Sequence, residues 1–168
     1  MTLYTQKHLS EIWWHFAKLA ISPIFAFGLC LLIAPGATVA DISIVVSNTN
    51  NNKFSSTIIR KLFMGKRNNF PDGTAATPLI QDENTEITHH FNLMLLSRSP
   101  QQYKAYWARI IFTGQGYPPE QAYSDAEIIE KIKADPSIIS YIHSSSLTSR
   151  VKEVLRISGP PNNEKTLF

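Results

Sequence analysis

Residues 61–73, KLFMGKRNNFPDG, place a basic glycine turn directly after an apolar helical face. Gly65 suits the end of that helix, because glycine adopts the left-handed conformation beyond a helix terminus without steric cost. A Walker-type phosphate loop has the opposite order, with glycines before a helix and a Lys-Ser or Lys-Thr pair at its start. Pro71 and Gly73 then favour a turn. The stretch therefore predicts a helix end and a turn within an α/β domain, and no nucleotide loop.

The segments on either side of this stretch predict two strands and the helix between them. Residues 41–46 (DISIVV) are apolar and β-branched, which is typical of a buried strand. A polar loop then ends at the helix-capping residues Ser55 and Ser56. The apolar helix face comprises Ile58, Ile59, Leu62 and Phe63. Residues 77–81 (TPLIQ) predict the second strand, and this order predicts a parallel pair with a right-handed crossover.

Two further helices are predicted downstream. The first begins at Thr85, and its apolar face comprises Ile87, Phe91, Met94 and Leu95. The second has Ser99 as its cap, Pro100 at its first position and Gln102 three residues after the cap. Its apolar face comprises Tyr103, Tyr106, Trp107, Ile110 and Ile111. We therefore expect Trp107 to lie in the core and not on a ligand platform.

The last third of the chain predicts a loop, a helix and two strands. Residues 113–123 contain glycines and prolines and predict a loop. Ser124 and Glu127 form a capping-box pattern, and Glu127 lies four residues before Lys131. The helix that follows buries Ile128, Ile129 and Ile132. Residues 138–142 and 151–157 predict strands, the second at a sheet edge. The predicted fold is α/β, with a mostly parallel sheet flanked by helices.

The first forty residues have the pattern of a secretory signal peptide. A basic, polar start precedes an apolar run at 19–33, and APGATVA then leads to Asp41. The run is about 15 residues long, shorter than the roughly 20 that span a membrane. We expect export to the periplasm with cleavage after Ala40; cleavage after Ala37 and retention as an anchor are the alternatives. The predicted domains are a signal peptide at 1–40, an α/β domain at 41–158 and a flexible tail at 159–168.

Composition restricts the chemistry of the mature domain. The only cysteine, Cys30, lies in the predicted signal peptide, so residues 41–168 can form no disulfide or thiolate site. Two of the 16 basic residues and one of the 13 acidic residues also lie there, which leaves 14 and 12 and a net charge of +2. This small excess is scattered along the sequence and predicts no nucleic-acid partner.

Few residues predict catalysis or metal binding. His89 and His90 are adjacent, so on a helix they point about 100° apart and do not readily share a metal. No glycine-flanked serine nucleophile is present, and we expect neither an enzyme nor a cofactor. Polar residues that follow the first two strands and precede helices are the candidate ligand-binding residues, because helix N-termini offer N–H groups to anions. They are Ser47, Asn48, Ser55, Ser56, Asn84 and Thr85.

The order of these segments resembles the phosphate-type periplasmic substrate-binding proteins of ABC transporters, and more closely their small single-lobe relatives. The similarity spans residues 42–157. It rests on ISIVVSN, IIRKLFMGKRNNFPDG, TPLIQDENTEITHHF, YWARIIFTGQGYPP and DPSIISYI. The most specific piece is Leu-Phe-x-Gly-Lys followed by Phe-Pro-Asp-Gly, since family members commonly have an aromatic residue where Phe70 stands. The resemblance implies a single lobe of the type 2 periplasmic-binding-protein-like fold, with a binding function and no catalysis.

The resemblance also implies an altered anion site. Phosphate binders of this family carry Arg-Ser-x-Gly-Ser-Gly-Thr after the second strand, where this chain has QDENTEIT. Gln81 replaces the arginine, Thr85 the serine and Glu86 a glycine. A missing guanidinium removes bidentate pairing with the anion. The implied partners are phosphate or another small anion, bound weakly, and a transporter permease. The alternative is an interaction module that binds an envelope protein.

Overall fold

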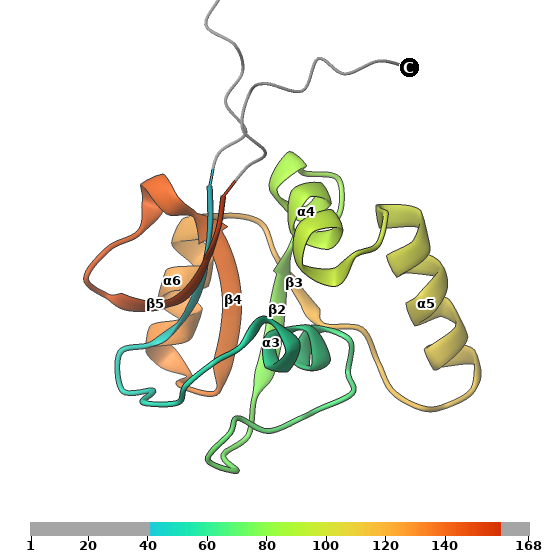
Figure 1. Ribbon diagram of the computed structural model, residues 1–168, viewed down its shortest axis with the longest axis horizontal. Coiled ribbons are helices and arrows are strands. Elements are labelled where there is room, and N and C mark those ends of the chain that lie inside the picture. The colour runs from blue at the N-terminus through green and yellow to red at the C-terminus, as the bar shows by residue number, and fades with distance from the viewer. Residues whose placement is uncertain (1–40, 159–168) are drawn as a thin grey trace, which may run out of the picture. The chain divides into compact units, whose positions relative to one another are not determined.

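The computed structural model describes residues 41–158, which form one sheet with helices on both faces (Figure 1). The predicted signal peptide at 1–40 and the predicted tail at 159–168 lie outside the described residues. The strands are β1 (Ile42–Ser47), β2 (Thr77–Gln81), β3 (Glu120–Ala122), β4 (Ile138–His143) and β5 (Val151–Ile157). The helices are α3 (Ser56–Phe63), α4 (Glu86–Phe91), the π-helical turn η1 (Asn92–Leu96), α5 (Pro100–Phe112), α6 (Asp125–Ala134) and the 3₁₀ turn η2 (Ser144–Ser146). None of the helices in this range is long and apolar enough to cross a membrane.

The sheet has the strand order β3-β2-β4-β1-β5. Strand β2 pairs in parallel with β3 and β4, whereas β1 pairs antiparallel with β4 and β5. Four strands therefore run in one direction and β1 runs against them. The predicted parallel pair of the first two strands is wrong, because β4 is inserted between them and β1 enters from the opposite direction. The mixed α/β fold itself is confirmed.

Two hydrophobic clusters lie on the two faces of the sheet. One face is covered by α3, α4 and α5, and the other by α6 (Figure 1). Alternate residues of β1 serve the two clusters, with Ile44 and Val46 on the first face and Val45 on the second. This alternation follows from the two-residue period of a strand. Because both faces are covered, all six residues of β1 are buried.

The first and last strands begin and end beside each other. Ile42, at the start of β1, pairs with Ile157, at the end of β5. The register of this pair shifts between Ile44 and Val45, so the ladder contains a bulge. Strand β5 is an edge strand, as its sequence predicted. Strand β3 was missed, since a three-residue strand next to two prolines carries little sequence signal.

The predicted helix ends are confirmed at several positions. The hydroxyl oxygen of Ser55 accepts a hydrogen bond from Ile58 N at 3.3 Å, and Ser99 forms a complete capping box with Gln102. Gly65 has φ of 63°, as a helix stop requires. A side chain there would also collide with Trp107, because an added Cβ would lie 2.7 Å from its Cη2 atom. Gly65 therefore ends α3 and leaves room for the tryptophan of α5.

Trp107 is in the core, with 6% of its surface exposed. Two other residues of the predicted apolar faces lie at the surface: Met94 is 47% exposed and Ile111 is 48% exposed. Met94 lies in the π-helical turn η1, whose wider turn changes the phase that an α-helical pattern assumes. Ile111 lies in the last turn of α5 and lines an open hollow. Burial in these elements therefore follows local helix geometry more closely than the ideal 3.6-residue period.

Candidate ligand site at the carboxyl edge of the sheet

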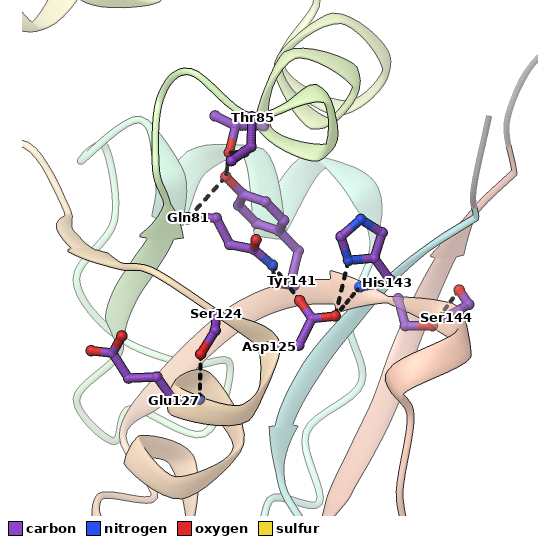
Figure 2. A network of polar contacts seen from close by, with 10 residues as sticks. Gln81, Thr85, Ser124, Asp125, Glu127, Tyr141, His143 and Ser144 are labelled. Atoms are coloured by element: carbon purple, nitrogen blue, oxygen red, sulfur yellow. Dashed lines mark hydrogen bonds and ion pairs between the residues drawn. The ribbon is translucent and has the colours of Figure 1, made fainter.

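The carboxyl ends of β2, β3 and β4 meet at one edge of the sheet, which we call the carboxyl edge. Gln81 is the last residue of β2, and His143 is the last residue of β4. Strand β3 ends at Ala122, and α6 begins three residues later at Asp125. Figure 2 shows that these three side chains converge. In parallel strands this is the edge at which ligands bind.

Asp125 is the centre of this cluster. Its Oδ1 atom accepts a hydrogen bond from Gln81 Nε2 at 2.6 Å. Its Oδ2 atom lies 2.9 Å from His143 Nδ1 and accepts from His143 N at 3.3 Å. Both carboxylate oxygens are thus engaged by protein groups. The carboxylate also lies in the first turn of a helix, where the helix dipole stabilises a negative charge.

Gln81 is held by two further bonds. Its Nε2 atom also donates to the carbonyl oxygen of Tyr141 at 3.2 Å, and its backbone N–H donates to the Tyr141 hydroxyl at 3.2 Å. Only 4% of Gln81 is exposed. The Gln81 amide is therefore fixed inside the protein by hydrogen bonds to protein groups.

Two buried hydroxyl groups, those of Tyr141 and Thr88, lie beside Gln81 and support this cluster. The Tyr141 hydroxyl lies 2.8 Å from Thr88 Oγ1, and its ring stacks on Phe91 with 4.0 Å between centroids. Burial raises the pKa of Tyr141 well above its ordinary value, so the phenol remains neutral and can donate. Thr85 joins this group, since its hydroxyl donates to the carbonyl oxygen of Asp82 at 2.7 Å and lies 3.0 Å from Thr88 Oγ1.

The loop beside the cluster is acidic. Asp82 accepts hydrogen bonds from Asn84 within its own turn, and Glu83 forms an ion pair with Lys104 at 3.2 Å. Glu86 follows at the start of α4 and is exposed. Together with Asp125, these carboxylates make the carboxyl edge a poor environment for a small anion, because like charges repel.

The six predicted ligand residues do not gather at one place. Asn84 and Thr85 lie at the carboxyl edge. Ser47 and Asn48 follow the end of β1, which runs the other way, and the loop to Ser55 and Ser56 leaves from that opposite edge (Figure 1). The candidate residues therefore lie in two groups at opposite edges of the sheet, because β1 and β2 run in opposite directions.

The residues that do converge were overlooked as site residues. Asp125 stands inside the capping pattern that begins at Ser124, Tyr141 lies in the predicted strand at 138–142, and His143 follows that strand and carried no prediction. The Ser124 cap is present, since its hydroxyl accepts from Glu127 N at 3.1 Å. Only the sheet order brings Asp125 to Gln81, since 44 residues separate them in the sequence.

Neither histidine of the adjacent pair joins the cluster. His89 is exposed, whereas both ring nitrogens of His90 are buried without a hydrogen-bond partner. Burial lowers the pKa of His90. Within residues 41–158, no group of three histidine, cysteine, aspartate or glutamate side chains is arranged to hold a metal ion.

The fold matches solved structures of phosphate-binding transport proteins. An ABC-type phosphate transport receptor from Vibrio cholerae superposes with a TM-score of 0.54 at 12% identity, over 70% of this chain and 47% of the receptor. A Clostridium perfringens protein, assigned as a phosphate ABC transporter substrate-binding protein and solved with phosphate bound, gives 0.55 at 13% identity. That match covers 70% of this chain and 46% of the other. No family model and no curated protein matches the sequence.

These matches confirm, at the level of the fold, the resemblance read from the sequence. The chain spans less than half the length of either neighbour. That share agrees with a single lobe of a periplasmic-binding-protein-like fold.

Proposed function

We propose that this chain is an exported, non-enzymatic, single-lobe binding protein of the phosphate substrate-binding type, whose ancestral anion site is closed by its own side chains. Two structural neighbours are phosphate transport proteins, and one has phosphate bound. The carboxyl edge is where a ligand of such a sheet would sit. Its polar groups are directed at one another.

The observation that carries this proposal is the Gln81–Asp125 hydrogen bond of 2.6 Å. Gln81 replaces the arginine that would pair with the anion, and the Asp125 carboxylate supplies the negative charge internally. An incoming phosphate would have to displace a carboxylate that already has three protein contacts. Phosphate affinity in the millimolar range or weaker follows, on the order of −4 kcal/mol or less favourable.

The second candidate function is an interaction module that binds an envelope protein and has no role in small-ligand transport. Two observations favour it. The polar groups of the carboxyl edge bond to one another, and the chain spans less than half the length of either neighbour. In this case the edge serves stability, and another surface carries recognition.

Calorimetry with inorganic phosphate tests the closed site. The double variant Gln81→Arg with Asp125→Ser restores a bidentate donor and removes the internal carboxylate. A charge-assisted hydrogen bond contributes roughly 1.5–3 kcal/mol, so we expect a gain of at least about tenfold in affinity. Removing Asp125 matters, because an arginine at position 81 would otherwise pair with it. The matched control is Thr148→Arg with Glu130→Gln, which makes the same charge change at two exposed positions of the domain.

Two results would contradict the proposal. Micromolar phosphate binding by the unmodified protein would show that the site is open. An equal gain in the control variant would show that net charge, and not the site, governs binding. No gain in either variant would favour the interaction module.

Export has its own test. Mass spectrometry of the protein from its native envelope should find an N-terminus near Asp41. A full-length product embedded in the membrane would exclude cleavage and would favour the retained anchor.

A further inference from the structure

Positive charge is concentrated in one half of the domain. Residues 42–71 contain five cations (Lys53, Arg60, Lys61, Lys66 and Arg67) and no acidic residue. Residues 87–119 contain three cations (Arg98, Lys104 and Arg109) and no acidic residue. The two segments supply α3, η1 and α5, which lie on the same face of the sheet (Figure 1). The basic excess appeared scattered in the sequence, and the fold gathers it.

Five of these cations form what we call the basic face: Arg60, Lys61, Lys66, Arg98 and Arg109. They line two adjoining hollows of about 370 and 620 Å³. The smaller hollow lies between α3 and residues 96–98 at the end of η1, and the larger one lies between the end of α3 and the C-terminal part of α5. Lys66 and Arg98 contribute to both hollows. The five side chains therefore make one continuous surface.

The basic face has no acidic counterpart in residues 41–158. Four other cations of the domain are paired: Lys104 with Glu83, Lys131 with Glu120 and Glu127, Arg150 with Glu130, and Arg156 with Glu153. Of the five cations of the basic face, none forms an ion pair with a described residue. Arg60 donates only to a carbonyl oxygen, that of Leu95, at 2.8 Å. Their positive charge is therefore available to an external partner.

Two guanidinium groups of this face are positioned by an aromatic ring. Arg98 and Arg109 lie 5.4 and 5.9 Å from the centroid of Tyr106, within the range of cation–π attraction. The Tyr106 hydroxyl donates to the carbonyl oxygen of Met64 at 2.7 Å, which fixes the ring between α5 and the end of α3. Both arginines are thus partly preorganised.

Large apolar side chains protrude beside these cations. Phe112 is 92% exposed and Tyr117 is 86% exposed. Tyr117 lines the same hollow as Lys66, Arg98 and Arg109, and Phe112 follows Arg109 by three residues on α5. The protein core does not account for either side chain.

We propose that the basic face docks the domain on an anionic lipid bilayer. Phosphate groups of the lipids would meet the five cations, and Phe112 and Tyr117 would enter the headgroup region. Cations attract acidic lipids, while aromatic side chains favour the boundary between water and acyl chains. This combination of unpaired cations and protruding aromatic residues matches a bilayer better than a free anion, which would leave Phe112 unexplained.

The test is sedimentation of the full chain with vesicles. One set contains phosphatidylglycerol and phosphatidylcholine in equal parts, and the other contains phosphatidylcholine alone. We expect binding to the anionic set that weakens with added salt. Each cation near an acidic surface changes partitioning roughly fivefold, so Arg109→Glu should lower it on the order of twentyfold. Phe112→Ala should also lower partitioning onto the anionic vesicles, and it should leave the salt dependence of partitioning unchanged.

Lys133→Glu is the matched control, because it makes the same charge change at an exposed residue of α6 on the other face of the sheet. Arg109→Glu and Lys133→Glu both retain the apolar run at residues 19–33, so any binding through that run is the same in the two variants. Equal losses for Arg109→Glu and Lys133→Glu would overturn the proposal, as would equal binding to neutral vesicles. Absence of binding to either vesicle set would also overturn it, and an acidic protein would then be the better occupant of this face.

Discussion

The carboxyl edge and the basic face differ in whether their charged and polar groups have partners within the protein. At the carboxyl edge, Asp125 is bonded through both oxygens and Gln81 is 4% exposed. On the basic face, four of the five cations are exposed and Arg98 is half-buried, without an acidic partner among the described residues. A polar group that is satisfied internally stabilises the fold, whereas an unpaired one in a hollow remains available for binding.

The five cations of the basic face therefore lie away from the carboxyl edge, which is where ligands bind in sheets of this kind. The polar groups of the carboxyl edge bond to one another and stabilise the fold. A surface supported by Trp107 and Gly65 carries the charge instead. Four substitutions test this division, from the largest expected effect to the smallest.

Trp107→Ala should cause the largest loss of stability. The indole is 6% exposed and packs against Tyr103 and Tyr106 beneath the basic face. Loss of a buried aromatic side chain costs about 3–5 kcal/mol, measured by denaturant unfolding. Phe112→Ala is the control, since its side chain is 92% exposed and should change stability by less than about 0.5 kcal/mol. Similar stability of the two variants would show that Trp107 does not support this face.

Gly65→Ala should be the next most destabilising change. Its φ of 63° disfavours any side chain, and an added Cβ would lie 2.7 Å from Trp107. Backbone strain and overpacking together predict a loss of about 2–4 kcal/mol. Gly114→Ala separates the two causes, because Gly114 has φ of 66° but no atom within 4 Å of an added Cβ. Equal losses at the two glycines would remove Trp107 from the explanation.

Tyr141→Phe tests the scaffold role of the carboxyl edge. It leaves Thr88 Oγ1 and the Gln81 N–H without the phenol oxygen that they now contact. Unsatisfied buried polar groups cost about 1–3 kcal/mol, so the midpoint of urea unfolding should fall. Tyr123→Phe is the exposed control, with 74% of the residue accessible. If Tyr141→Phe were neutral, the edge would contribute little to stability and the contrast with the basic face would weaken.

We expect the His90 side chain to give the free energy of unfolding a small pH dependence. Burial lowers its folded-state pKa, while the unfolded value stays near 6.5. As the pH falls below 6.5, the unfolded state binds a proton that the folded state resists, so stability decreases until the folded pKa is reached. His90→Gln should remove this part of the slope in thermal unfolding between pH 7 and pH 5. His89→Gln, at an exposed neighbour, should leave it unchanged, and an unchanged slope in both variants would refute the assignment.

Local structure could be predicted because its signals lie within a few residues. The Ser55 and Ser99 caps, the Gly65 stop and the buried Trp107 all follow from short-range spacing, and all are confirmed. The resemblance read from residues 42–157 is likewise confirmed as a fold.

Sheet order could not be predicted, because nothing near β1 indicates that β4 will be inserted beside it. That one error placed Ser47 and Asn48 with Asn84 and Thr85, although the structure puts the two pairs at opposite edges. It also concealed the Gln81–Asp125 contact. The basic face was concealed for a related reason, since its cations come from two segments that only the tertiary fold brings together.

The pairing of Ile42 with Ile157 places the entry and exit of the domain side by side. A domain with adjacent ends can be inserted into a surface loop of another protein, or its ends can be joined and new ones opened elsewhere, without disturbing its core. This lobe thus has the adjacent chain ends that domain insertion and circular permutation require. Circular permutation with new termini in the exposed turn near Gly114 would preserve every strand pairing.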